Sequence, residues 1–161
     1  MLMSAPSSVH EIADALLVVA DRARVSVSLA KLHALVYYAH AWHLARTEGV
    51  PLFDAAIEAH VQGPVVPAVE ARFASMRWTP GVLVVEAPVL HPDITSHLEE
   101  ILGTYGHYSA WELARLTHDE LPWLEARGGL PGDAACTRAI RDETMQTCYA
   151  ARLDTPVAAG G

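Results

Sequence analysis

Residues 28–46 read SLAKLHALVYYAHAWHLAR, and this stretch decides the fold. It is long enough for about five helical turns, and Lys31 is the only fully charged residue between its two ends. Ser28 is a suitable N-cap, and Gly49 follows the last periodic residues, where a helix often ends. Because a helix that is apolar over most of its circumference is normally buried, we predict that residues 28–46 form the central core helix.

The composition describes one acidic domain. The chain has 161 residues and 52% hydrophobic content, which is enough apolar material for a core. Its formal net charge is −8 and no run of Lys and Arg is present, so we expect no direct binding to nucleic acid. The apolar run at residues 15–20 is too short to span a membrane and lacks the layout of a secretion signal. We expect a cytoplasmic protein without a membrane partner.

Hydrophobic periodicity predicts further helices on both sides of the central one. The clearest helix start is a capping box, in which the side chains of Ser109 and Glu112 each bond the other's backbone amide. Pro67 and Pro122 suit the first turn of a helix, where a missing amide hydrogen has no cost. Four predicted helices have both ends defined and cover residues 9–24, 28–46, 110–118 and 133–153. Three further helices are predicted to begin at Pro67, Asp93 and Pro122.

Two short stretches favour extended structure instead. Apolar and polar residues alternate at residues 57–61, and residues 82–85 form a mostly β-branched run. The predicted fold class is therefore mainly α: one compact domain of about six or seven helices around the buried helix at 28–46, with at most this small extended pair. The helical domain is expected to cover residues 9–153, with flexible tails at residues 1–8 and 154–161.

Large side chains at the periodic positions are predicted to build the core. Aromatic rings bury large areas on folding, so Trp42 and Trp111 are assigned a structural role. Contact with a partner is the alternative for each aromatic residue, because Tyr and Trp are enriched at interfaces. The predicted core residues are Leu32, Leu35, Val36, Tyr38, Trp42, Phe73, Trp111 and Leu116.

Cysteine usage points to a reducing compartment. Cys136 and Cys148 are the only two cysteines and lie in one helix-like segment. That spacing is more than three helical turns, which is too far for a disulfide within the helix. We expect free thiols, as is usual in the cytosol.

No catalytic or metal-binding motif stands out among the polar residues. Nine histidines invite a metal hypothesis, but the chain has no H-E-x-x-H and no paired cysteine motif. The run at residues 117–120, Thr-His-Asp-Glu, contains a nucleophile, a base and an orienting group. Members of a catalytic triad converge in space rather than in sequence, so a helix C-terminus explains this run better. We predict a protein that is not an enzyme and has no cofactor or metal.

Three sequence blocks carry a resemblance to a known family. They are KLHALVYYAHAWHLA from Lys31, GVPLFDAAIEAHVQGPVVPAVEARF from Gly49 and YSAWELARLTHDELPWLEAR from Tyr108. In this order the blocks resemble the Panacea domain family, which includes SocA-like antitoxins and phage-associated GepA-like proteins. The resemblance covers nearly the whole chain, from Val9 to Leu153. It implies a mainly helical domain that neutralises a toxin encoded beside it by binding that toxin directly.

Several alternatives stay open at this point. Some relatives act as adaptors that deliver their toxin to a cellular protease, and a general phage-related interaction module is a further option. A metal-dependent hydrolase that uses the histidines is less favoured, because no ligand set or triad can be assembled. The sequence leaves the oligomeric state open, a homodimer included.

A toxin-binding surface is predicted at two polar motifs. Such a surface combines an aromatic anchor with polar groups, and Trp123 is the proposed anchor beside residues 117–120. The competing interpretation is that these motifs only fix turns and helix caps. The predicted partner-binding residues are His60, Gln62, Gly63, Thr117, His118, Asp119, Glu120 and Trp123.

Overall fold

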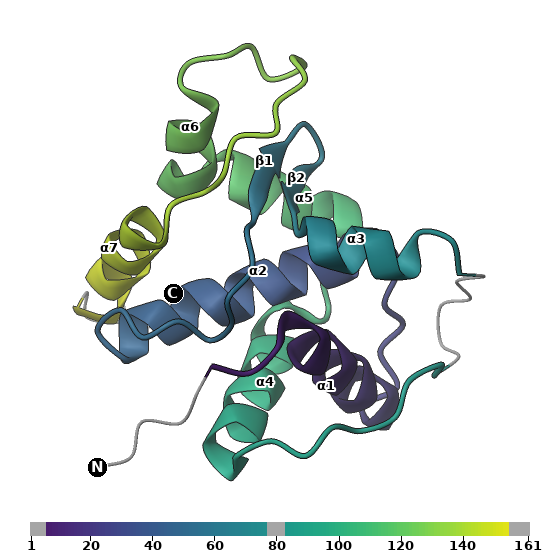
Figure 1. Cartoon of the computed structure of the whole chain (residues 1–161). Coiled ribbons are helices and arrows are strands. Elements are labelled where there is room, and N and C mark those ends of the chain that lie inside the picture. Colours follow the sequence, from purple (N-terminus) through teal and green to yellow (C-terminus); the bar gives the residue numbers. More distant parts are fainter. Residues whose placement is uncertain (1–5, 77–82, 155–161) are drawn as a thin grey trace.

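The computed structural model describes residues 6–76 and 83–154. Within these ranges the fold is mainly α, as predicted, with seven helices and one small antiparallel hairpin (Figure 1). Most of the two predicted tails, at residues 1–5 and 155–161, lies outside the described residues. The elements are α1 Val9–Arg22, α2 Leu29–Arg46, β1 Glu58–His60, β2 Gly63–Val65, α3 Pro67–Phe73, α4 Pro92–Tyr105, α5 Ala110–His118, α6 Leu121–Arg127 and α7 Asp142–Asp154.

Helix α2 is the central element of the molecule. The Ser28 side chain caps it by accepting a hydrogen bond from the backbone N–H of Lys31 at 3.2 Å. Helix α2 contacts α1, α4, α5, α7 and the hairpin, and it crosses the middle of the molecule in Figure 1. Every residue from Lys31 to Ala41 is buried, because neighbouring elements cover the whole circumference of this part of the helix. Lys31 is also buried, and its Nζ donates to the carbonyl of Gly106 at 2.5 Å.

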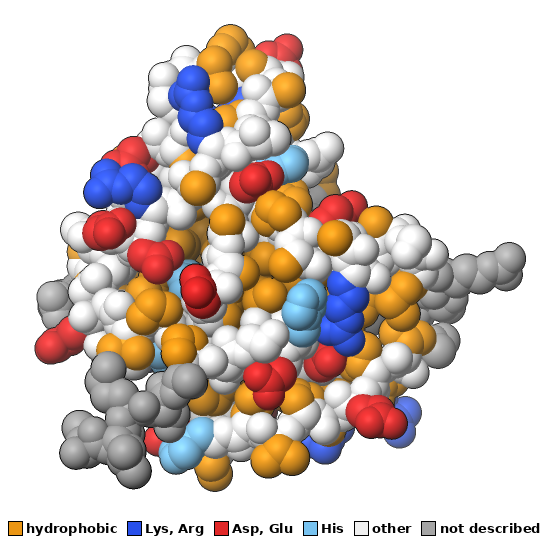
Figure 2. Space-filling model, in the orientation of Figure 1, with side chains coloured by type: hydrophobic (Ala, Val, Ile, Leu, Met, Phe, Trp, Pro, Cys, Tyr) orange, Lys and Arg blue, Asp and Glu red, His pale blue; other side chains and the backbone are white. Residues whose placement is uncertain are grey.

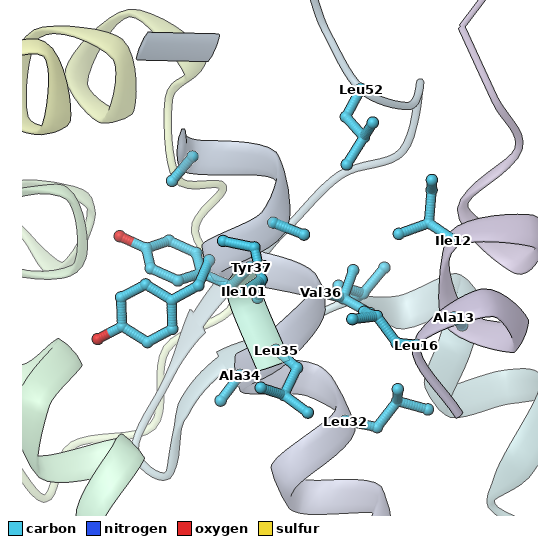
Figure 3. Close-up of a cluster of buried hydrophobic side chains, with 14 of the residues drawn as sticks. Ile12, Ala13, Leu16, Leu32, Ala34, Leu35, Val36, Tyr37, Leu52 and Ile101 are labelled. Atoms are coloured by element: carbon cyan, nitrogen blue, oxygen red, sulfur yellow. The ribbon is translucent and has the colours of Figure 1, made fainter. Parts of the chain in front are cut away.

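The aliphatic half of the core lies between α1 and α2. Figure 3 shows Ile12 and Leu16 of α1 directed toward Leu32 and Val36 of α2, whereas Tyr37 projects away from α1. Trp42 is only half-buried; it packs on the edge of the core, and its Nε1 donates to the Tyr105 hydroxyl at 2.8 Å. Five of the predicted core residues are fully buried: Leu32, Leu35, Val36, Tyr38 and Phe73.

The aromatic half of the core surrounds the carboxylate of Glu120. Tyr38 and Tyr149 donate hydrogen bonds to its two oxygens at 2.6 and 2.9 Å, and the Arg152 guanidinium donates at 2.5 Å. Burial raises the pKa of both phenols above the ordinary value, so the hydroxyls stay protonated and act as donors. Glu120 precedes α6, and its partners lie on α2 and α7, so one side chain connects three helices.

The hairpin differs from the predicted extended pair. Strand β1 pairs with β2, with Glu58 opposite Val65 and His60 opposite Gly63. Of the predicted second strand, residues 83–85 form no strand and residue 82 lies outside the described residues. The chain reverses immediately after β1 because Gly63 adopts a φ of +119°, which side-chain-bearing residues rarely adopt.

The last helix is shorter than predicted, because it begins at Asp142 and not at residue 133. The segment before it runs extended beside β1, where the Ala59 N–H donates to the Arg138 carbonyl at 2.9 Å. The Arg127 guanidinium also donates to the carbonyl of Ala134, which a helix from residue 133 would have used internally. Cys136 therefore lies outside α7, and both cysteines are free thiols. None of the described helices is long and apolar enough to cross a lipid bilayer.

We expect the free energy of unfolding to fall as the pH drops below about 6.5. Burial lowers the pKa of four histidines, His33, His43, His97 and His118, below the ordinary value of 6.5. Between the folded and unfolded pKa values the unfolded chain binds more protons, so acid favours unfolding and the full stability is present above this range. Urea denaturation between about pH 7.5 and 5.5 measures this; an unchanged free energy over that range would contradict the burial of these rings.

Candidate functional site

Helix α5 exposes the largest apolar side chain of the region. Trp111 is 66% exposed and Leu116 is 37% exposed, so the prediction that they belong to the core is wrong for both. The buried stripe of α5 is formed by Leu113 and Thr117 instead. Residues 111 and 113 lie about 200° apart around a helix, so only one of them can face the core. Leu113 takes that position, and Trp111 consequently faces solvent.

Trp111 does not stand alone on this face of α5. The Arg115 guanidinium lies over its ring at 4.9 Å from the centroid, as expected for residues four apart on a helix. Trp and Arg are the residue types that most often dominate the binding energy of an interface. The pair therefore presents two residue types typical of protein interfaces on one exposed helix face.

A hollow of about 390 Å³ lies between the hairpin and helices α2, α3 and α5. Its walls are mostly apolar and built from small side chains, among them Ala30, Ala34, Pro64, Val65, Ala110 and Ala114. The two α5 alanines immediately precede Trp111 and Arg115, so the Trp–Arg pair lies about 100° around the helix from the hollow. We call the hollow together with Trp111 and Arg115 the hairpin–α5 surface.

Two histidines line the hollow, and each of them pairs with a carboxylate. His33 Nε2 lies 2.8 Å from Glu70 Oε2, and His33 Nδ1 accepts a hydrogen bond from the Val66 N–H at 3.1 Å. Because Nδ1 is an acceptor, the neutral ring carries its proton on Nε2 and donates it to Glu70. Burial lowers the pKa of His33 and favours this neutral form. His60 pairs in the same way with Glu58, at 2.8 Å between His60 Nε2 and Glu58 Oε1.

Two of the predicted partner-binding residues lie at this surface and a third supports it. His60 and Gln62 line the hollow, and Gln62 is exposed. Gly63 is buried, and a Cβ at this position would come within 3.2 Å of the Thr117 hydroxyl oxygen. Gly63 therefore allows the hairpin to pack closely against α5.

The second predicted motif is largely structural. Trp123 is 4% exposed, so it is not the exposed aromatic anchor that was predicted; its Nε1 donates to the His60 carbonyl at 2.9 Å. His118 stacks on the Trp123 ring at 4.2 Å. Thr117 and Glu120 are buried as well, whereas Asp119 is exposed. Among the aromatic residues here, the exposed position belongs to Trp111, and its position about 200° around the helix from Leu113 is the sequence signal that identifies it.

Gln62→Ala is expected to leave the free energy of unfolding within about 0.5 kcal/mol of wild type, because the side chain is exposed. His118→Ala is expected to lower it by about 1–2 kcal/mol, because it removes the stacking on Trp123. Urea denaturation of both variants measures this difference. Equal stability of the two variants would show that His118 has no structural role.

The histidines and the Thr-His-Asp-Glu run have separate partners in the fold. His40 pairs with Asp142 at 3.0 Å, and His43 bonds the Val50 carbonyl at 2.8 Å. The Thr117 hydroxyl donates to the Ala114 carbonyl at 2.8 Å rather than to a histidine. Across residues 6–76 and 83–154, no group of three or more His, Cys, Asp and Glu side chains is arranged to hold a metal ion.

Charged side chains are scattered on the visible face of the molecule. In Figure 2, Lys and Arg side chains occur singly among acidic and apolar groups, without a continuous basic area. This distribution agrees with the net charge of −8.

One comparison with known proteins finds a matching family. The family described as "Antitoxin SocA-like, Panacea domain" matches residues 32–124, which is more than half of the chain. The match begins in α2 and ends in α6, so it includes the hairpin and α5. It confirms the resemblance carried by the three sequence blocks. No curated protein and no solved structure matches the chain.

Proposed function

Because the chain belongs to the SocA-like antitoxin family with a Panacea domain, we propose that it neutralises a cognate protein toxin by binding the toxin directly. The family supports an antitoxin-type role and a protein partner in general. The observation that supports direct binding is the exposed Trp111, held under the Arg115 guanidinium beside an apolar hollow.

Single exposed apolar residues are common on protein surfaces and need no explanation. The hairpin–α5 surface differs because it combines a large aromatic ring, a guanidinium and a concave apolar area within one region. This combination is characteristic of the centre of a protein interface, where a few residues contribute most of the binding energy.

The charge of the protein supports the same proposal. Its net charge of −8 attracts a basic partner over a distance and raises the association rate. Toxins that act on nucleic acids or nucleotides need basic surfaces to bind phosphate groups. An acidic antitoxin is thus suited to a basic toxin, and the two free thiols suit neutralisation in the reducing cytoplasm.

Growth rescue tests the proposed function. The protein is expressed together with the product of the gene next to its own, in cells that this product alone prevents from growing. We expect growth to be restored at the same level in cells with and without their main ATP-dependent proteases. Rescue that requires a protease would support the adaptor mechanism instead, and absence of rescue would contradict the antitoxin function.

A further inference from the structure

We propose that the hollow beside α5 receives one apolar side chain of the toxin, and that a Lys or Arg next to this side chain pairs with Glu70. The inference rests on the proposed function and specifies which chemistry of the partner is recognised. Its basis is the size of the hollow, the nature of its walls and the charge at its rim.

The hollow is large enough to admit one large side chain. Its volume of about 390 Å³ is at the lower end of the range for small-molecule sites, about 300–1,000 Å³. The walls from α2, the hairpin and α5 are built mainly of alanine, proline and valine. These walls offer apolar contact over most of their area and have little conformational entropy to lose on binding.

The charge at the rim of the hollow determines which toxin residue can lie next to the bound apolar side chain. Glu70 is about half exposed, with 49% of its side chain accessible, and within the described residues its ion-pair partner is His33. Burial keeps the pKa of His33 below the ordinary value, so the ring gives Glu70 a hydrogen bond but no compensating charge at neutral pH. Neither Lys nor Arg is among the residues that line the hollow. The rim therefore presents a negative charge that a cation of the partner can neutralise.

A small probe tests this chemistry without the toxin. Benzamidine combines an aromatic ring with an amidinium, and benzamide has the same shape without the charge. We expect benzamidine to shift the backbone amide NMR signals of Gln62, Val65 and Ala114 at millimolar concentration, and to bind at least about fivefold more tightly than benzamide. Equal binding of the two compounds, or no shift at these residues, would overturn the proposed recognition of a cation.

Glu70→Gln assigns the effect to the carboxylate. The Gln side chain can still accept the hydrogen bond from His33 Nε2, so the fold is expected to be retained. We expect this variant to bind benzamidine about fivefold more weakly and benzamide as before. Unchanged benzamidine binding by a folded Glu70→Gln variant would show that Glu70 is not the recognition group.

Ala30→Leu tests whether the toxin uses the hollow. Ala30 lines the hollow from an exposed position on α2, so the larger side chain occupies the space without entering the core. Ala71→Leu on the exposed face of α3 is the matched control, because Ala71 does not line the hollow. We expect Ala30→Leu to weaken toxin binding at least about tenfold and Ala71→Leu to have no effect.

Each negative outcome has a separate meaning. If the wild-type protein rescues growth but Ala30→Leu binds the toxin at full strength, the hollow is not the contact and the antitoxin function stands. If size-exclusion chromatography shows a dimer that Ala30→Leu converts to a monomer, the occupant is a second copy of the chain and the proposal is overturned.

Discussion

Glu120→Ala is expected to lower the free energy of unfolding by about 3–5 kcal/mol. The change removes the acceptor of Tyr38, Tyr149 and Arg152. It leaves the Tyr38 hydroxyl without its acceptor inside the core, and Tyr149 keeps only its contact with the Tyr37 hydroxyl at 3.2 Å. A buried polar group without its hydrogen bond costs about 1–3 kcal/mol. Most of the loss therefore comes from the tyrosines, because Arg152 is nearly half exposed and water can solvate it. Many domains have a total stability of about 5–15 kcal/mol, so this variant approaches the limit of folding.

Chemical denaturation followed by circular dichroism measures this loss. Asp119→Ala is the matched control, because Asp119 is the neighbouring carboxylate and is exposed. We expect this control to stay within about 0.5 kcal/mol of wild type. Equal stability of Glu120→Ala and Asp119→Ala would show that the carboxylate does not connect α2, α6 and α7 as the structure describes.

Trp111→Ala is expected to weaken binding of the toxin by at least about 2 kcal/mol, or about 30-fold. The ring is 66% exposed and can bury its area only against a partner. For the same reason the free energy of unfolding is expected to change by less than about 0.5 kcal/mol. The combination of weakened binding and intact stability identifies a residue that acts in the interface.

Val89→Ala is the control for Trp111→Ala. Val89 is 96% exposed and lies in the segment before α4, which runs on the other side of the molecule from the hairpin in Figure 1. It tests whether loss of any exposed apolar side chain weakens the complex, and we expect unchanged affinity. Full affinity of Trp111→Ala would contradict the assignment of the hairpin–α5 surface as the contact.

The sequence predicts those parts of the fold that depend on local patterns. The apolar circumference of residues 28–46 indicated a buried helix, and the Ser109–Glu112 capping box located the start of α5; the structure confirms both. Trp111 was wrongly assigned to the core because every apolar residue of this helix was assumed to face inward. The positions of these residues around the helix axis were not compared. Once Leu113 is inside, the helical geometry excludes Trp111 from the core.

The features that the sequence did not predict depend on contacts between residues that are far apart in the chain. Nothing in the local sequence shows that Glu120 meets Tyr38, which lies 82 residues earlier in the chain. The same holds for the segment before α7: its helical periodicity is real, but Arg127 and strand β1 take up its backbone groups. The hollow could not be predicted at all, because it is formed by side chains from the hairpin and three separate helices.

Isothermal titration calorimetry of the purified protein with the purified toxin is the most direct test of the proposed mechanism. Direct neutralisation predicts a saturable complex with a Kd below about 1 µM, formed in the absence of any protease or other cellular factor. Growth rescue in cells without detectable binding in the calorimeter would contradict direct neutralisation.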